Sequence, residues 1–331
     1  MRKQVGVIGA GSWGIALAKV LHTNGHAVTV WSIAEPEIVM LREKREHVEK
    51  LPGVMLPEDM VFTTDLKEAV SGRDYLILAV PSVFTRSTAR SMAPYVRQGQ
   101  VIVWVAKGIE EETLATLSDI VEQEIPEAEA AVMCGPSHAE EVGCGLPTTV
   151  VAGAGKKDVA EGVQDLFMNE VFRVYTSPDV LGMELGGALK NVIALAAGMA
   201  DGLGYGDNTK AALITRGIAE MSRLATAMGA SYETLGGLTG IGDLIVTCAS
   251  RHSRNRKAGM LMGQGYTMQQ ATDEVKMVVE GVYSAKAAVR LAEKYGVDMP
   301  IVEAVNRVLF EEKPAKEAVK ELMARDKRAE H

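Results

Sequence analysis

The first part of the chain alternates short apolar runs with longer segments that have the periodicity of helices. Residues 75–80 and 101–106 are apolar without the alternation that a strand exposed on one face shows. Strands covered on both faces and joined by crossover helices produce this rhythm. The pattern predicts an α/β fold in which a Rossmann-like, doubly wound parallel sheet uses strands at residues 4–8, 27–31, 75–80, 101–106, 130–134, 148–152 and 172–175.

After Ser177 the β-rich runs largely stop, and helical patterns punctuated by glycine take over. We therefore predict a dinucleotide-binding domain over residues 1–177 and an all-α domain over residues 178–331. Helices of the second domain are expected at residues 181–199, 210–228, 256–262, 268–273, 285–295 and 301–310.

A Gly-rich turn follows the first predicted strand and opens a helical segment. Gly9 suits the tight turn, Gly11 lets the backbone approach a pyrophosphate, and Gly14 lets the helix and the strand pack closely. The helix N-terminus then offers N–H donors and a partial positive charge to phosphates. Strand, turn, helix and second strand all fall within about 30 residues, so the sequence predicts a site for NAD or NADP.

The preference between the two coenzymes stays open. An acidic residue at the end of the second strand would bind the ribose 2′-hydroxyl, and an arginine there would bind a 2′-phosphate. The chain has neither at residues 31–34, although Glu35, Arg42, Lys44 and Arg45 follow.

Composition narrows the class of protein. The chain has 331 residues, which at roughly 150 residues per domain suggests two domains. Its net charge of −8 argues against bulk nucleic-acid binding. Three cysteines without a CxxC pair argue against a disulfide framework and a Cys-rich zinc site, and they favour a reducing cytoplasm. The most apolar stretch, residues 185–200, is interrupted by Lys190 and Asn191 and falls short of the roughly 18 apolar residues of a membrane span.

Lys190 is the strongest candidate for a general base. Its helical segment is apolar on nearly every side, so the helix should be buried and the amine desolvated. Desolvation and nearby cations such as Lys107 or Arg254 would lower the pKa of the amine, whereas a nearby Asp243 would oppose that shift. The alternative is a lysine whose head group reaches solvent at the domain edge.

A basic run, residues 251–257, follows a Gly-rich turn at residues 236–242. Its hydroxyl, amide and guanidinium donors suit a phosphate monoester, especially if a helix begins at Asn255. The alternative is a solvated charged face, and we expect Arg251, Arg256 and Lys257 to be partly exposed. His138 could also be a catalytic base, but it has no partner at metal-ligand spacing and Lys190 is the plainer candidate, so we interpret it as structural or as a support for the site residues.

Several local strings carry a more specific resemblance. They are Ala106-Lys107-Gly108, Gly135-Pro136-Ser137-His138-Ala139, Gly187-Ala188-Leu189-Lys190-Asn191, Gly240-Ile241-Gly242-Asp243, Ser253-Arg254-Asn255-Arg256 and Val279-Glu280-Gly281. In this order, and across nearly the whole chain, they resemble the bacterial NAD(P)-dependent sn-glycerol-3-phosphate dehydrogenases. Many members of that family have threonine where this chain has Ala106, a position with no assigned role.

The resemblance implies an enzyme that interconverts sn-glycerol 3-phosphate and dihydroxyacetone phosphate with NAD(P)H and feeds glycerophospholipid synthesis. It implies that Lys190 is the proton acceptor. For the nicotinamide dinucleotide it implies Ser12, Trp13, Lys107, Ala139, Arg254, Val278 and Glu280. For the phosphorylated substrate it implies Lys107, Gly135, Ser137, Lys190, Asp243, Ser253, Arg254 and Asn255. Asn191 and Thr247 are further candidates to steady the lysine or the substrate oxygen.

Two other functions stay open from the residues. A non-catalytic NAD(P)H sensor would bind nucleotide without turnover and would not need Lys190 or the donors around Arg254. A related 3-hydroxy-acid or ketopantoate-type reductase would need a carboxylate clamp in place of a phosphate site. The Ala- and Gly-rich helices of the second half are candidates for packing against a second copy in a homodimer.

Overall fold

The computed structural model describes residues 1–327 together with 329 and 330. Arg328 and His331, at the end of the predicted helical domain, lie outside the described residues. The chain divides into two compact units. Unit 1 comprises residues 1–107 and 115–184, and unit 2 comprises residues 108–114 and 185–331. The boundary that we place after Ser177 stays a prediction.

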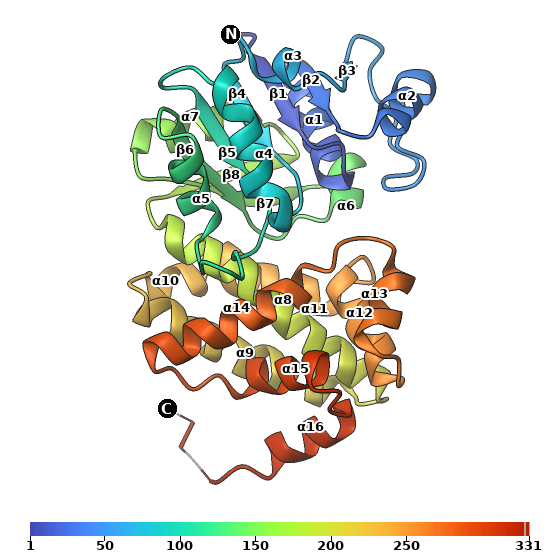
Figure 1. Cartoon of the computed structure of the whole chain (residues 1–331), viewed down its shortest axis with the longest axis vertical. Helices are drawn as coiled ribbons and strands as arrows, with labels where there is room; N and C mark the ends of the chain where they lie inside the picture. Colours follow the sequence, from blue (N-terminus) through green and yellow to red (C-terminus); the bar gives the residue numbers. More distant parts are fainter. Residues whose placement is uncertain (328, 331) are drawn as a thin grey trace. The chain divides into compact units, whose positions relative to one another are not determined.

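Unit 1 is built on an eight-stranded sheet with the order β3-β2-β1-β4-β5-β6-β7-β8 (Figure 1). The first six strands in this order run parallel, and the order reverses between β1 and β4, which is the usual position of a dinucleotide site. The strands are β1 (Gln4–Ile8), β2 (Ala27–Trp31), β3 (Val61–Thr63), β4 (Tyr75–Leu78), β5 (Val101–Trp104), β6 (Glu129–Cys134), β7 (Thr148–Ala154) and β8 (Phe172–Ser177).

The doubly wound fold is confirmed, with two differences from the prediction. β7 pairs antiparallel with β6, so the sheet is mostly and not wholly parallel. β3 is an additional edge strand of three residues, too short to show a hydrophobic period.

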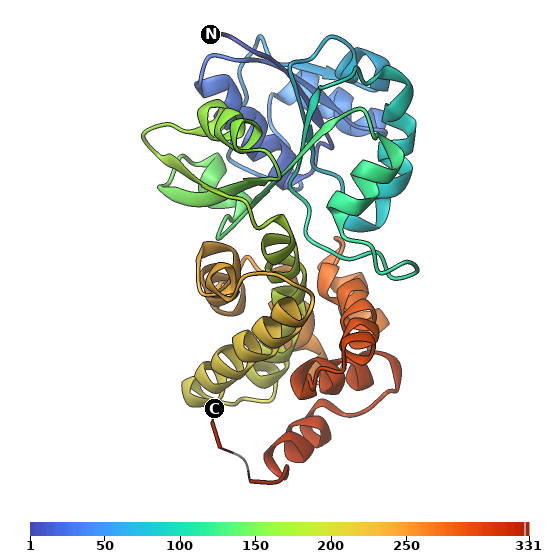
Figure 2. The ribbon, with the colours of Figure 1, turned by 90° about the vertical axis from the view of Figure 1, so that its left-hand side faces the viewer.

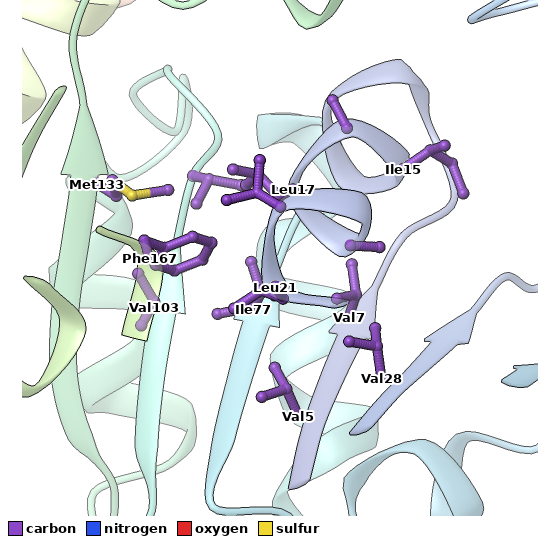
Figure 3. Close-up of a cluster of buried hydrophobic side chains, with 14 of the residues drawn as sticks. Val5, Val7, Ile15, Leu17, Leu21, Val28, Ile77, Val103, Met133 and Phe167 are labelled. Carbon is purple, nitrogen blue, oxygen red and sulfur yellow. The ribbon is translucent and has the colours of Figure 1, made fainter. Parts of the chain in front are cut away.

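Helices cover both faces of this sheet. Val5 and Val7 of β1 belong to a core cluster with α1 (Ser12–Thr23), α6 (Ala139–Gly143) and α7 (Lys157–Phe167). Figure 3 shows Leu17 and Leu21 of α1 directed toward this side of the sheet. The intervening Gly6 faces α3, because successive strand residues point to opposite faces. The remaining helices of unit 1 are α2 (Glu35–Lys44), α3 (Leu66–Val70), η1 (Ser82–Phe84), α4 (Thr85–Met92), η2 (Ala93–Tyr95) and α5 (Leu117–Glu124).

Unit 2 is helical in all of its described regular structure, as predicted (Figures 1 and 2). Its elements are α8 (Val180–Gly202), whose first turns belong to unit 1, α9 (Asp207–Ala227), α10 (Tyr232–Leu235), the π-helical turn η3 (Leu238–Gly242), α11 (Asp243–Ala249), α12 (Arg254–Gly263), α13 (Met268–Val275), α14 (Glu280–Tyr295), α15 (Pro300–Phe310) and α16 (Ala315–Met323).

Helix α8 is the central helix of unit 2. Every residue from 182 to 200 is buried, including Lys190. The helix has 23 residues, longer than predicted, and by length and hydropathy alone it could cross a membrane. However, 89% of its most apolar window is buried inside the protein, which is the pattern of a core helix. The expectation of no clear membrane span therefore rests on the burial of α8 and not, as predicted, on a stretch too short to cross a membrane.

Candidate active site

The Gly-rich turn between β1 and α1 has the geometry of a phosphate cradle. Gly9 has a φ of +120°, and a Cβ there would lie 2.8 Å from the backbone of Ala79. A Cβ on Gly14 would lie 2.1 Å from the Gly9 carbonyl oxygen, so the helix can pack this closely only with glycine. A Cβ on Gly11 would meet nothing within 4 Å. The backbone at Gly11 is therefore open to a ligand.

The first turn of α1 is suited to an anion. Its backbone N–H groups, at Ser12, Trp13 and Gly14, have no acceptor within the helix. Gly11 is the N-cap and supplies no side-chain cap. Trp13 is partly buried and packs against the core cluster. The turn thus fits the pyrophosphate of a dinucleotide, with an open backbone and unused donors at a helix N-terminus.

The carboxyl ends of β5 and β6 bring three predicted residues together. The Lys107 ammonium donates to the carbonyl oxygen of Gly135 at 3.1 Å, and the Ser137 hydroxyl donates to the same oxygen at 3.0 Å. Gly135 has a φ of +145°, and a Cβ there would lie 3.1 Å from Val150. Ala139 is buried as the first residue of α6. Adjacent strands therefore place a cation and a hydroxyl at one edge of the sheet.

In unit 2, Lys190 lies in a buried polar cluster. Most neighbouring residues along α8 are apolar and buried, and only 5% of Lys190 itself is exposed. Its ammonium donates to Asp243 Oδ1 at 2.5 Å and to Thr247 Oγ1 at 2.7 Å. Asp243 and Thr247 are 1% and 4% exposed. The alternative of a lysine that reaches solvent is therefore wrong, because the head group is held inside the protein.

The turn η3 positions this cluster. π-helical turns are rare, and they occur often at functional sites. Gly186 of α8 and Gly240 allow close contact here, since a Cβ on Gly186 would lie 2.5 Å from the Thr239 carbonyl oxygen. η3 leads directly into α11, whose first residue is Asp243 and whose next turn carries Thr247. The Gly-rich turn seen in the sequence thus brings α11 against α8.

Asn191 and Asn255 form a second buried link. Asn255 Nδ2 donates to Asn191 Oδ1 at 2.9 Å, and Asn255 Oδ1 accepts from the backbone N–H of Gly281 at 2.8 Å. A Cβ on Gly281 would lie 2.6 Å from the Asn191 carbonyl oxygen, so the start of α14 packs closely on α8. The two amides therefore join α8, α12 and α14. This joining role of Asn255 was not predicted, because it depends on contacts between distant helices.

The basic run separates into exposed and paired residues. Ser253 is buried and caps α12, accepting from the backbone N–H of Arg256 at 3.2 Å. Arg254, the first residue of α12, is exposed and donates to the Val278 carbonyl oxygen at 3.2 Å. Arg256 is partly buried and paired with Asp201 at 2.6 Å. The helix begins one residue earlier than Asn255, and its N-terminus carries the predicted phosphate donors.

The other residues of this region have the following positions. Glu280 is partly buried at the first position of α14. Arg251 and Lys257 are exposed. His138 is partly buried at the N-cap of α6. Within the described part of the chain, no group of three His, Cys, Asp or Glu side chains is arranged to hold a metal ion.

Comparison with known proteins covers both units. Residues 4–160 match the N-terminal model, and residues 179–320 the C-terminal model, of NAD-dependent glycerol-3-phosphate dehydrogenase. A glycerol-3-phosphate dehydrogenase (NAD(P)+) of Agathobacter rectalis is 76% identical over 328 residues, covering 99% of this chain and 98% of that protein. The enzyme of the same name from Fusobacterium nucleatum is 59% identical, covering 99% of this chain and 98% of that protein.

A solved structure gives the same result at greater sequence distance. The crystal structure of glycerol-3-phosphate dehydrogenase from Coxiella burnetii, at 35% identity, superposes with a TM-score of 0.95 and covers 98% of this chain and 99% of that one. Sequence and fold therefore agree, and the chain belongs to the NAD-dependent glycerol-3-phosphate dehydrogenase family.

Proposed function

We propose that the protein interconverts sn-glycerol 3-phosphate and dihydroxyacetone phosphate, with Lys190 as the general acid and base. The observation that carries this proposal is the buried amine of Lys190, held by Asp243 and Thr247. Both acceptors come from α11, so one rigid helix defines the direction of the amine. A buried, oriented amine of this kind is suited to proton transfer at a substrate oxygen.

Oxidation of a secondary alcohol removes two hydrogens in different forms. The turn formed by Gly9, Gly11 and Gly14 would hold the dinucleotide, whose nicotinamide would supply a hydride acceptor for the carbinol carbon and a hydride donor in the reverse direction. The neutral amine of Lys190 takes the hydroxyl proton with its lone pair as the C–O bond becomes a carbonyl, and it is left as the ammonium. In the reduction, the Lys190 ammonium polarises the ketone oxygen and returns the proton.

The phosphate of the substrate requires cations and N–H donors. At the N-terminus of α12, Arg254 supplies a guanidinium, and the helix supplies backbone N–H groups and a partial positive charge. Lys107 supplies an ammonium at the end of β5. We propose that Arg254 and Lys107 bind the anionic parts of the substrate and the dinucleotide, with Ser137 and Asn255 as neutral donors.

The cellular role that we propose is the supply of sn-glycerol 3-phosphate for glycerophospholipid synthesis in the cytoplasm. Membership of the family supports this role. The cysteines agree with a reducing compartment, because all three lie within the described residues and none of them forms a disulfide. A homodimer stays a prediction.

A non-catalytic NAD(P)H sensor is less consistent with unit 2. A sensor has no need for a lysine and an aspartate buried together, because removing charged groups from water costs free energy even where the two groups pair. The relatives named above are enzymes by name, and the match extends over both units. The sensor function would require nucleotide binding without turnover.

The first experiment tests the substrate. Oxidation of reduced nicotinamide is followed with dihydroxyacetone phosphate and, separately, with unphosphorylated dihydroxyacetone. We expect turnover of the phosphorylated ketone and a much lower kcat/KM for the other, since the charge-assisted contacts to phosphate are absent. Equal kcat/KM values for the two ketones would remove the case for a phosphate site.

The second experiment tests the base. Lys190→Ala should lower kcat by about 10²-fold or more, because general acid–base catalysis contributes about 10²–10⁴. Lys294→Ala is the matched control, since Lys294 lies in the last turn of α14 and contacts the ring of Tyr295. A folded Lys190→Ala protein with the kcat of the wild type would show that another group carries the proton.

A further inference from the structure

Four polar residues from the end of β2, helix α2 and the segment after it form a cluster that the sequence did not reveal. We call it the Glu37 cluster, comprising Ser32, Glu37, His47 and Lys50. Ser32 Oγ lies 2.5 Å from Glu37 Oε2, and His47 Nε2 lies 2.8 Å from Glu37 Oε1. The Lys50 ammonium also donates to Glu37 Oε1. The carboxylate is thus held on both of its oxygens.

The protons in this cluster can be assigned. Burial raises the pKa of Glu37, but hydrogen bonds from His47, Lys50 and Ser32 outweigh burial and bring the pKa to about 2. The ionised carboxylate only accepts hydrogen bonds, so the Ser32 hydroxyl must donate its one proton to Glu37. Ser32 Oγ also accepts from the backbone N–H of Ala34 at 3.2 Å. Toward any further group, Ser32 can therefore act only as an acceptor.

The cluster lies at the position where dinucleotide-binding folds recognise the adenosine ribose. Ser32 directly follows β2, and its backbone N–H donates to the Thr63 carbonyl oxygen at 3.2 Å. The preceding residue, Trp31, accepts from the backbone N–H of Gly9 in the phosphate turn at 2.9 Å. A dinucleotide held at that turn has its ribose 2′ position near the end of β2. The group at the 2′ position distinguishes NADH from NADPH.

The arginines near this position are bound elsewhere. Arg42 Nε and Nη2 donate to the Phe62 carbonyl oxygen at 3.0 and 2.6 Å. Arg45 Nη1 donates to the Met60 carbonyl oxygen at 2.8 Å, and its guanidinium lies over the Phe62 ring. Both therefore anchor the segment that leads into β3. Ile33, which follows Ser32, is 84% exposed and brings no charge.

We propose that Ser32 and Glu37 make the protein prefer NADH to NADPH, because they present a hydrogen-bond acceptor beside a carboxylate at the ribose 2′ position. A 2′-hydroxyl donates a proton to Ser32. A 2′-phosphate has only acceptor oxygens, finds no donor on Ser32 and is repelled by Glu37. The inference rests on the proposed function, since it takes the turn after β1 as the site of the dinucleotide.

The test is direct binding of the two nucleotides in the absence of substrate. Calorimetric titration of the wild-type protein should give a Kd for NADH at least about tenfold below that for NADPH, the effect of roughly one hydrogen-bonded or repelled charge. Glu37→Gln removes the negative charge and leaves the Lys50 ammonium unopposed. In this variant the Kd for NADPH divided by the Kd for NADH should fall about tenfold, chiefly because NADPH binds more tightly.

The matched control is Glu35→Gln. Glu35 lies in the same first turn of α2, is exposed, and is changed by the same loss of charge. Because solvent screens an exposed charge, the ratio should stay within about twofold of the wild type. A wild-type protein that binds NADPH as tightly as NADH overturns the inference. So does a folded Glu37→Gln variant with an unchanged ratio.

A second variant covers the case in which Glu37→Gln does not fold. Ser32→Ala removes the acceptor and should weaken NADH binding more than NADPH binding, whereas an equal effect on both contradicts the inference. Failure of the proposed function has a different outcome. If neither nucleotide binds, both proposals fail; if NADH binds preferentially and dihydroxyacetone phosphate is not reduced, the coenzyme inference stands and the proposed reaction fails.

Discussion

The Thr247 hydroxyl orients Lys190 while its own proton is donated to another oxygen. Thr247 Oγ1 donates to the Asp243 carbonyl oxygen, one helical turn earlier, at 2.6 Å. A threonine hydroxyl has a single proton, so toward Lys190 it acts only as an acceptor. Two of the three ammonium donors of Lys190 are thereby directed to α11. Thr247 is in this sense a positioning residue.

Replacing Thr247 tests that role. Thr247→Val keeps the shape of the side chain and removes the acceptor, so kcat should fall about tenfold, equivalent to roughly 1.4 kcal/mol, with a smaller change in KM. Thr247→Ser keeps the hydroxyl and should restore most of kcat. The pH profile of kcat should shift in Thr247→Val and not in Thr247→Ser. An unshifted profile in both variants would assign Thr247 to packing alone.

A second buried carboxyl has a structural role in unit 1. Glu184 Oε1 accepts from the backbone N–H of Ser118 at 2.9 Å, at the N-terminal turn of α5, and Oε2 accepts from the Ser118 hydroxyl. Burial raises the pKa of Glu184 to about 7, although the hydrogen bonds from Ser118 act in the opposite direction. The folded protein therefore favours the protonated acid more than the unfolded chain does.

This shift predicts a pH dependence of stability. The contribution of Glu184 is fully present below its unfolded pKa of 4.5 and is lost as the pH rises through about 7. Relative to Glu184→Gln, the free energy of unfolding of the wild type should fall across this window by at most about 1.4 kcal/mol per pH unit. Urea unfolding at several pH values measures it. Glu170→Gln, at an exposed residue, should show no such difference, and parallel curves for wild type and Glu184→Gln would contradict the assignment.

At the scale of elements, glycines let α8 and α12 approach backbone to backbone. A Cβ on Gly198 of α8 would lie 2.1 Å from the Arg256 carbonyl oxygen, and one on Gly259 of α12 would lie 2.1 Å from the Leu195 carbonyl oxygen. Gly202 and Gly263 make equivalent contacts one turn further along. This close packing aligns the N-terminus of α12, which carries the proposed phosphate donors, against the helix that carries the Lys190 amine. These four glycines therefore serve helix packing within unit 2.

A single methyl group tests the packing. Gly259→Ala should lower the free energy of unfolding by about 1–3 kcal/mol or more, since backbone atoms must move to accept the Cβ. The midpoint of denaturant unfolding reports this loss, and kcat/KM should fall with it. Gly236→Ala is the control, because its Cβ would make an ordinary contact at 3.5 Å and its φ is −75°. Equal effects of the two substitutions would show that the helix contact is not the cause.

At the scale of the whole molecule, the two units contain different residues of the proposed site. The phosphate turn, Lys107 and the Glu37 cluster belong to unit 1, whereas Lys190, Asp243 and Arg254 belong to unit 2. α8 contributes to both units, with Glu184 as the last residue of unit 1 and Leu185 as the first of the next segment. Nucleotide binding and proton transfer should therefore be separable by mutation.

The separation predicts that Lys190→Ala still binds NADH. Its Kd for NADH, measured by titration, should stay within about twofold of the wild type while kcat falls. Hydrogen exchange should show NADH protecting the amides around residues 9–14 equally in both proteins, because ligand binding stabilises the state that it binds. Loss of NADH binding in a folded Lys190→Ala protein would contradict the prediction, because it would show that Lys190 itself contributes to nucleotide affinity.

Local sequence determined much of the fold and part of the site. The alternation of short apolar runs with helical segments located seven of the eight strands, and three glycines in a strand–turn–helix context indicated the dinucleotide site. These features are local, since strand burial and turn geometry depend on residues close in the chain. The burial of Lys190 also followed from a local feature, the apolar surface of its own helix.

Only the tertiary structure decided which groups meet. The antiparallel pairing of β7, the contact of Thr247 with Lys190 across 57 positions, and the link between Asn191 and Asn255 across 64 depend on how distant segments pack. The Glu37 cluster likewise joins a strand end, a helix and the segment after it. A hydrogen bond depends on distances within tenths of an ångström, and periodicity carries no information about those distances between separate elements.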